Sequence, residues 1–174
     1  MYLMTVPNLL STSRIAIGLF IAFSLNTIPI IWLLLIFVVA VLSDIFDGRL
    51  ARNQTQVSPI GTLVDHSSDA IFVTSIISRF AFDGLVPWLL PILIAVSFFQ
   101  YTLDHRLLHL PSFRASRLGR FNGIAYYVFS GAGILLATVT QFSPLGDVFY
   151  CIAVVLIITT LSSMVERAYF VFQR

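Results

Sequence analysis

Lysine is absent from this 174-residue sequence, whose ten basic residues are all arginines. Arginine suits forked contacts with phosphate, although a genomic preference for arginine codons would explain the same pattern. The single cysteine, Cys151, lies in an apolar run, which excludes an intrachain disulfide framework and indicates a small packing residue. No basic stretch is interleaved with aromatic residues, so a groove for nucleic acid is not expected.

Charge is also scarce, because only 10% of the residues are charged whereas 58% are hydrophobic. A soluble domain of this length could not bury that much apolar surface. The N-terminus lacks a basic region, and Pro7 and Asn8 stand where the apolar run of a signal peptide would begin, so no cleavable signal is expected. The composition therefore predicts an integral membrane protein.

Six apolar segments follow a short amphipathic N-terminal stretch. They cover residues 11–25, 28–52, 59–80, 85–103, 120–140 and 147–172. Segments of about 20 residues are long enough to span a bilayer as helices, and the polar stretches between them indicate turns and connectors. No internal repeat is visible. We expect an all-α integral membrane fold of six transmembrane helices that forms a single domain over residues 1–174.

The arginines are distributed unequally between the two ends of these six segments. Only Arg79 falls near the side opposite the N-terminus. The nine others flank the side of the N-terminus: Arg14, Arg49, Arg52, Arg106, Arg114, Arg117, Arg120, Arg167 and Arg174. Because positive charge that flanks membrane helices stays cytoplasmic, we expect both termini in the cytoplasm and the protein in the cytoplasmic (inner) membrane.

Four of the eight acidic residues gather in two otherwise apolar segments. Asp44 and Asp47 are three residues apart, and Asp65 and Asp69 are four apart, so each pair lies on one face of its helix. The connector between the two segments is short, so an antiparallel hairpin would bring the four carboxylates together. The sequence predicts that they converge at one depth.

Four carboxylates cannot share a pocket of low dielectric constant unless cations or protons balance them. No basic partner is expected at sufficient density to do so, and oxygen ligands without a cysteine or histidine cluster favour Mg²⁺ or Mn²⁺. His66 is a single residue beside the site. One or two such ions could hold a pyrophosphate and stabilise displacement at phosphorus. The alternative, helix caps and interface carboxylates, fits one such residue better than four in register.

Small residues accompany the aspartates. Gly48 and Ala51 leave space for a ligand on the helix, Arg52 can meet a phosphate, and Gly61 opens the next helix toward the same cleft. Taken singly, each has an ordinary explanation, because glycine and alanine in membrane helices commonly mark close packing. Arg52 alone would serve as a topology anchor.

These residues together resemble a known signature. The pattern of eight fixed residues over 26 positions is similar to that of the CDP-alcohol phosphatidyltransferases at every fixed position: Asp44-x2-Asp47-Gly48-x2-Ala51-Arg52-x8-Gly61-x3-Asp65-x3-Asp69. The segment Pro7-Asn8-Leu9-Leu10, followed by Arg14, also resembles the opening segment of that family.

The resemblance implies six transmembrane helices, a homodimer and a site open to the cytoplasm. It implies that Asp44, Asp47 and Asp65 bind Mg²⁺ or Mn²⁺, as two ions, and that Asp69 is the general base and also touches metal. It implies that the CDP moiety is bound by residues of the same motif: Gly48, Ala51, Arg52 and Gly61. The acceptor hydroxyl would attack the β-phosphate of CDP-diacylglycerol, and CMP would leave.

The acceptor alcohol is less defined. Arg114, Arg117 and Arg120 could bind the phosphate of an acceptor such as glycerol 3-phosphate or inositol phosphate, and anchoring to anionic lipid explains them equally well. His66 and Ala70 stand where phosphatidylglycerophosphate synthases typically have proline and lysine, which disfavours that branch.

Three other assignments remain open. Within the family, the donor could be a CDP-linked small alcohol and the acceptor a diradylglycerol. A divalent-cation channel or transporter would also place carboxylates in its helices, but it would not need small residues at nucleotide-site spacing. A non-catalytic scaffold is disfavoured by the intact motif.

Overall fold

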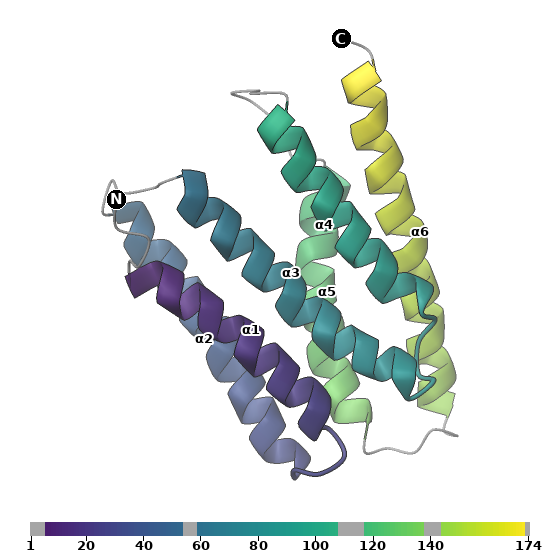
Figure 1. Cartoon of the computed structure of the whole chain (residues 1–174). Coiled ribbons are helices and arrows are strands. Elements are labelled where there is room, and N and C mark those ends of the chain that lie inside the picture. Colours follow the sequence, from purple (N-terminus) through teal and green to yellow (C-terminus); the bar gives the residue numbers. More distant parts are fainter. Residues whose placement is uncertain (1–5, 54–58, 108–116, 138–143, 173–174) are drawn as a thin grey trace. The chain divides into compact units, whose positions relative to one another are not determined.

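The computed structural model describes residues 6–53, 59–107, 117–137 and 144–172, with side chains for residues 11–44, 63–102, 118–137 and 144–169. Over these ranges the chain forms helices and no strands: α1 (Val6–Ser24), α2 (Ile30–Asn53), α3 (Pro59–Phe82), α4 (Leu89–Leu107), α5 (Arg117–Leu136) and α6 (Pro144–Phe172). Figure 1 shows them in sequence order. The prediction of an all-α fold is confirmed.

The helices divide into two compact units, Met1–Ile76 and Ile77–Arg174, and the division falls within α3. The first unit contains α1, α2 and the beginning of α3, and the second contains the remainder. In the first unit α1 and α2 lie side by side (Figure 1), joined by a turn in which the amides of Thr27 and Ile28 donate to the carbonyl of Ser24.

Several helix boundaries differ from those expected, among them those of α4, which covers Leu89–Leu107 instead of 85–103, and of α6, which begins at Pro144 instead of residue 147. Residues 6–10, which we assigned to a separate amphipathic stretch, are the first turns of α1, where Pro7 is well tolerated because its missing amide would have no helical partner. α5 begins at Arg117 instead of residue 120 and ends at Leu136, whereas residues 138–140 of the predicted segment lie outside the described ranges. Polar residues at the start of α5 are therefore helical.

The end of α3 is set by a glycine. Gly84 has φ of 76°, a left-handed conformation that a residue with a side chain rarely adopts. The amide of Leu85 donates to the carbonyl of Phe80 at 2.9 Å, and that of Gly84 donates to Ala81 at 3.1 Å. This pair of bonds is the Schellman motif, which satisfies the last carbonyls of the helix. It explains why the third apolar segment stops at residues 83–84.

Packing in the first unit depends on one close approach between helices. A Cβ added to Gly18 of α1 would lie 2.8 Å from the Cα of Phe72 in α3, so only glycine permits this crossing. Phe72 is fully buried and stacks on Phe37 of α2, with ring centroids 5.7 Å apart. Phe72 therefore joins the three helices of this unit.

In the second unit α6 packs against both α4 and α5. Phe149 stacks on Phe129 with ring centroids 4.0 Å apart and meets Phe80 edge to face at 5.9 Å. Polar contacts also cross between these helices. The buried guanidinium of Arg167 donates to the hydroxyl of Ser97 at 2.6 Å. The second unit thus combines an aromatic core with a buried polar contact between α4 and α6.

Large apolar side chains are exposed on every helix of the described part of the chain, among them Phe23, Ile31, Phe99, Ile124 and Val165. Within the described residues one helical stretch, Pro144–Tyr169, is long and apolar enough to cross a membrane. Shorter apolar stretches occur at Ser11–Ser24, Ile30–Asp44 and Leu89–Thr102. The number of membrane spans therefore stays a prediction.

Candidate active site

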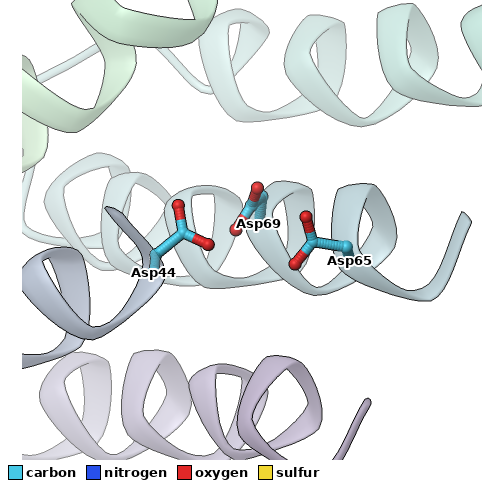
Figure 2. Close-up of side chains that lie close together, drawn as sticks. All are labelled: Asp44, Asp65 and Asp69. Atoms are coloured by element: carbon cyan, nitrogen blue, oxygen red, sulfur yellow. The ribbon is translucent and has the colours of Figure 1, made fainter. Parts of the chain in front are cut away.

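Three of the four predicted carboxylates converge in the first unit. Asp44 comes from α2, and Asp65 and Asp69 come from successive turns of α3. One carboxylate oxygen from each residue lies within 4.8 Å of the others. Figure 2 shows the three side chains pointing toward a common region. The two helices are joined by a short connector, so their acidic faces meet, as the hairpin expected from the sequence requires.

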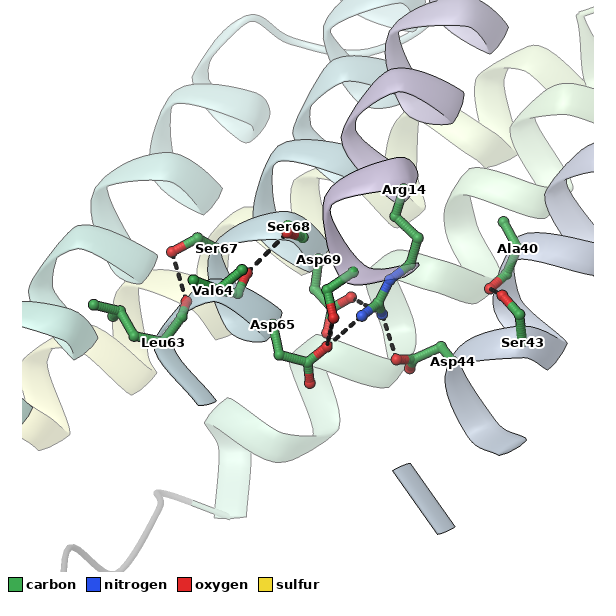
Figure 3. Close-up of polar contacts among 11 residues, drawn as sticks. Arg14, Ala40, Ser43, Asp44, Leu63, Val64, Asp65, Ser67, Ser68 and Asp69 are labelled. Carbon is green, nitrogen blue, oxygen red and sulfur yellow. Dashed lines mark hydrogen bonds and ion pairs between the residues drawn. The ribbon is translucent and has the colours of Figure 1, made fainter. Parts of the chain in front are cut away.

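An arginine stands among these carboxylates. Arg14 of α1 forms ion pairs with Asp44, Asp65 and Asp69 (Figure 3). Its Nη1 atom meets oxygens of Asp44 and Asp69, and its Nη2 atom donates to Asp65. A single guanidinium does not neutralise three carboxylates, but Arg14 was not identified from the sequence as a partner of the cluster. Arg14 was counted only as a topology arginine and as part of the opening segment.

A second residue of α1 reaches the same cluster. The hydroxyl of Ser11 donates to Oδ1 of Asp65 at 2.8 Å. Ser11 and Arg14 are three residues apart, so both side chains lie on one face of α1. Both are buried. The first helix therefore contributes two hydrogen-bond donors to carboxylates that the sequence assigned to the second and third helices alone.

Solvent exposure differs sharply across the cluster. The Arg14 side chain is 5% exposed, whereas those of Asp44, Asp65 and Asp69 are 32%, 41% and 28% exposed. The guanidinium thus lies on the buried side of the carboxylates, and part of each carboxylate faces the surface of the protein. A charged group as buried as Arg14 is stable only when paired and hydrogen-bonded, which the three carboxylates achieve.

The donor set fits a hard divalent cation. Asp44, Asp65 and Asp69 supply only oxygen ligands, which Mg²⁺ and Mn²⁺ prefer, and their partial exposure gives a cation access. Three carboxylates against one guanidinium leave two uncompensated negative charges on the described side chains, which is the charge of one such ion. The cluster therefore carries an excess of negative charge that favours binding of a divalent cation.

Most of the remaining predicted site residues have side chains outside the described ranges, so their place relative to this site stays a prediction. Four of them belong to the second half of α2, where side chains are outside the described ranges: Asp47, Gly48, Ala51 and Arg52. The same holds for Gly61 in the first turn of α3. Arg114 lies outside the described residues, and the side chain of Arg117 does too, although this residue begins α5. Arg120 is an exposed residue of α5, in the second unit.

The sequence did contain a signal for Arg14. A charged residue within an apolar segment needs a partner of opposite charge. The acidic residues expected at a similar depth in the membrane lie on the second and third apolar segments. Ser11, one turn earlier, gives that face of the helix a second polar group. Assigning the arginine to topology alone overlooked this pairing.

Comparison with known proteins identifies the family of this chain. The family model described as CDP-alcohol phosphatidyltransferase matches residues 4–160, a range that covers α1 to α5 and the first part of α6. This chain belongs to the CDP-alcohol phosphatidyltransferase family. The match extends beyond the motif to most of the chain, and it confirms the resemblance that the aspartate motif carried.

Two curated relatives are similar to part of this chain. A Mycobacterium tuberculosis (strain H37Rv) protein named "Putative cardiolipin synthase" is 36% identical over 86 residues, which cover 49% of this chain and 41% of the relative. A Streptomyces coelicolor protein named "Cardiolipin synthase (CMP-forming)" is 33% identical over 101 residues, which cover 53% of this chain and 46% of the relative. The matched region thus spans less than half the length of each relative.

Proposed function

We propose that this chain is an integral membrane transferase that moves a phosphatidyl group from CDP-diacylglycerol to an alcohol and releases CMP. The observation that carries this proposal is the convergence of Asp44, Asp65 and Asp69 within 4.8 Å, on helices that bear the family motif. Such a cluster suits a reaction in which the negative charge of a pyrophosphate must be balanced.

Each carboxylate has a role in this proposal. Asp44, Asp47 and Asp65 hold Mg²⁺ or Mn²⁺, as two ions, and a bound ion supplies charge neutralisation for the pyrophosphate. Asp69 accepts the proton of the acceptor hydroxyl, whose oxygen then attacks the β-phosphorus of the donor. The bond from that phosphorus to the bridging oxygen breaks, and CMP leaves with the electron pair. Gly48, Ala51, Arg52 and Gly61 line the site of the CDP moiety.

The acceptor that we favour is phosphatidylglycerol. Two relatives are named cardiolipin synthase, one of them CMP-forming, and cardiolipin with CMP results when the free hydroxyl of phosphatidylglycerol takes the phosphatidyl group. This acceptor carries a phosphate, as do the small acceptors considered from the sequence. Arg114, Arg117 and Arg120 can meet that phosphate through charge-assisted hydrogen bonds.

The environment that we propose is the cytoplasmic membrane, crossed six times, with both termini and the active site on the cytoplasmic side. The exposed apolar side chains on every described helix support a lipid surround, because soluble monomers rarely expose so many together. The arginine distribution supports the orientation, which reporter fusions to both ends would test. A homodimer is part of the same proposal.

A panel of acceptors tests the function. The full chain, purified in detergent, is given CDP-diacylglycerol and Mg²⁺ with one acceptor at a time, and CMP and the lipid product are measured. We expect cardiolipin and CMP with phosphatidylglycerol, and little product with glycerol 3-phosphate or inositol phosphate. Turnover with a water-soluble acceptor alone would overturn the acceptor. No CMP with any acceptor, in a folded sample, would overturn the reaction class.

A further inference from the structure

Arg14 occupies the position that a cation would need in the acidic cluster. Its two terminal nitrogens contact one oxygen each of Asp44, Asp65 and Asp69, the same carboxylates whose oxygens converge as possible metal ligands. Metal ions bind carboxylate oxygens at about 2.0–2.2 Å, so a cation on these oxygens would lie within a few ångströms of the guanidinium. Two cations at that separation repel each other strongly where the dielectric constant is low.

The burial of these side chains indicates that the Arg14 guanidinium, and not a metal ion, is the cation that the folded protein itself supplies to the cluster. Arg14 is almost fully enclosed and reaches the carboxylates from below, while the carboxylates themselves are partly exposed. Without a positive charge, three carboxylates brought together on α2 and α3 would repel each other and push those helices apart. The guanidinium supplies that charge from α1 and links three helices through one side chain.

We propose that Arg14 is a tethered counter-cation that fills the acidic cluster in the metal-free protein and is displaced when a divalent cation binds. This inference rests on the metal role proposed above for the same carboxylates. Arg14 is here a positioning residue: it holds α1, α2 and α3 in register before the ion arrives, and its contacts with Asp44, Asp65 and Asp69 compete with the ion for the same oxygens.

Competition has a measurable sign. If Arg14 and the metal exclude each other, removing the guanidinium should tighten metal binding and weaken the metal-free fold. If Arg14 instead stays in place and orients the ligands, removing it should weaken metal binding. Coupling between two binding events in a protein is typically about 5- to 150-fold, which sets the scale of the expected change in metal affinity.

The test uses Mn²⁺ alone as the probe, with no substrate. The full-length wild type and Arg14→Gln are purified in detergent, and free Mn²⁺ is followed by electron paramagnetic resonance during titration. We expect Arg14→Gln to bind Mn²⁺ at least about fivefold more tightly than the wild type. Equal or weaker binding by Arg14→Gln would overturn the proposal.

Thermal unfolding of the same two proteins supplies an independent readout. In excess chelator, Arg14→Gln should unfold at a lower temperature than the wild type, because its carboxylates have lost their counter-cation. At saturating Mn²⁺ that deficit should disappear, since a ligand that binds only the folded state stabilises it more as its affinity rises. A deficit that persists unchanged at saturating Mn²⁺ would mean that Arg14 stays in the loaded cluster.

Matched variants separate charge from packing. Arg79→Gln removes an arginine whose ion pair, among the described residues, is with Asp83 and not with the three carboxylates, and it should leave Mn²⁺ affinity unchanged. Ser11→Ala removes the other contact from α1 to Asp65 without removing charge, and it should not tighten Mn²⁺ binding. Arg14→Lys keeps the positive charge but lacks the forked guanidinium that reaches three carboxylates. Its affinity for Mn²⁺ should therefore lie between those of the wild type and Arg14→Gln. This variant also gives a reading if Arg14→Gln does not fold.

Asp65→Asn distinguishes failure of this inference from failure of the proposed function. Mn²⁺ that binds the wild type but not Asp65→Asn is bound at the cluster. If such binding exists and Arg14→Gln does not tighten it, only the counter-cation role is lost. If neither the wild type nor Arg14→Gln binds Mn²⁺, the metal role of the carboxylates is wrong as well.

Discussion

Asp65 and Asp69 lie one turn apart on α3 and have different surroundings. Asp65 is the more exposed of the two, and it accepts hydrogen bonds from both Ser11 and Arg14. Asp69 is one turn deeper along the helix and is held by Arg14. The base role proposed for Asp69 needs this carboxylate to meet the acceptor hydroxyl, whereas Asp65 is proposed to hold the metal.

A substitution at Asp69 tests that role. In Asp69→Asn the ability to accept the hydroxyl proton is lost, while Asp44 and Asp65 keep their carboxylates, so turnover should fall by about 10²–10⁴-fold. Binding of Mg²⁺ and a CDP-lipid, measured by calorimetry, should be largely retained. Asp44→Asn should lose binding and turnover together. If Asp69→Asn loses donor binding as completely as Asp44→Asn, Asp69 is a further ligand and the base must be sought elsewhere.

At the scale of the helix, the position of α1 depends on Gly18. This residue is one turn after Arg14 on the same helix, and Phe72, against which it packs, is three residues after Asp69 on α3. The close crossing of the two backbones therefore sets the distance over which Arg14 must reach its carboxylates. A wider crossing would draw the guanidinium away from α3.

Gly18→Ala tests this dependence. The added Cβ would lie 2.8 Å from the backbone Cα of Phe72, which a rotamer change cannot relieve, so the helices must separate. Overpacking of this kind typically costs about 1–3 kcal/mol, and we expect a lower unfolding temperature together with reduced CMP release. Gly123→Ala is the matched control, because a Cβ at that helical glycine meets nothing within 4 Å. Gly123→Ala should be neutral or slightly stabilising. Equal unfolding temperatures for the two variants would contradict the close-crossing account.

The helical pattern of the described part of the chain could be predicted from sequence because it depends on local features. Apolar runs fixed the number of helices, and Asp83-Gly84 marked the end of α3, where Gly84 adopts its positive φ. The convergence of Asp44 with Asp65 and Asp69 was also predictable, because a short connector favours antiparallel packing of the two helices that it joins. Local periodicity and short connections thus accounted for most of the fold and for the acidic part of the site.

The contribution of α1 to the site could not be obtained in the same way. Arg14 and Asp69 are 55 residues apart, and their pairing depends on the crossing at Gly18, which no local pattern encodes. The beginning of α1 was also missed: residues 6–10 were assigned to a separate amphipathic stretch, yet proline is compatible with the first turn of a helix. Long-range ion pairs and helix starts therefore marked the limits of the sequence prediction.

At the scale of the whole molecule, the arginine distribution has one exception, Arg79, whose contacts the structure describes. Arg79, the one arginine expected near the non-cytoplasmic side, pairs with Asp83 through two contacts of 3.0 Å, Nε to Oδ2 and Nη2 to Oδ1. Its guanidinium also lies 5.5 Å from the centre of the Phe82 ring. The proposed orientation depends on the bias of nine arginines against one, and a single arginine near the other side does not reverse that bias.

Metal dependence of CMP release tests the central claim most directly. The purified full chain, with CDP-diacylglycerol and phosphatidylglycerol, is assayed in Mg²⁺ or Mn²⁺, in excess chelator, and again after the ion is restored. We expect release of CMP with either ion, loss in chelator and recovery on restoration, and no release by Asp65→Asn under any of these conditions. Undiminished CMP release in excess chelator, or by Asp65→Asn, would contradict the assignment of this carboxylate cluster to the chemistry.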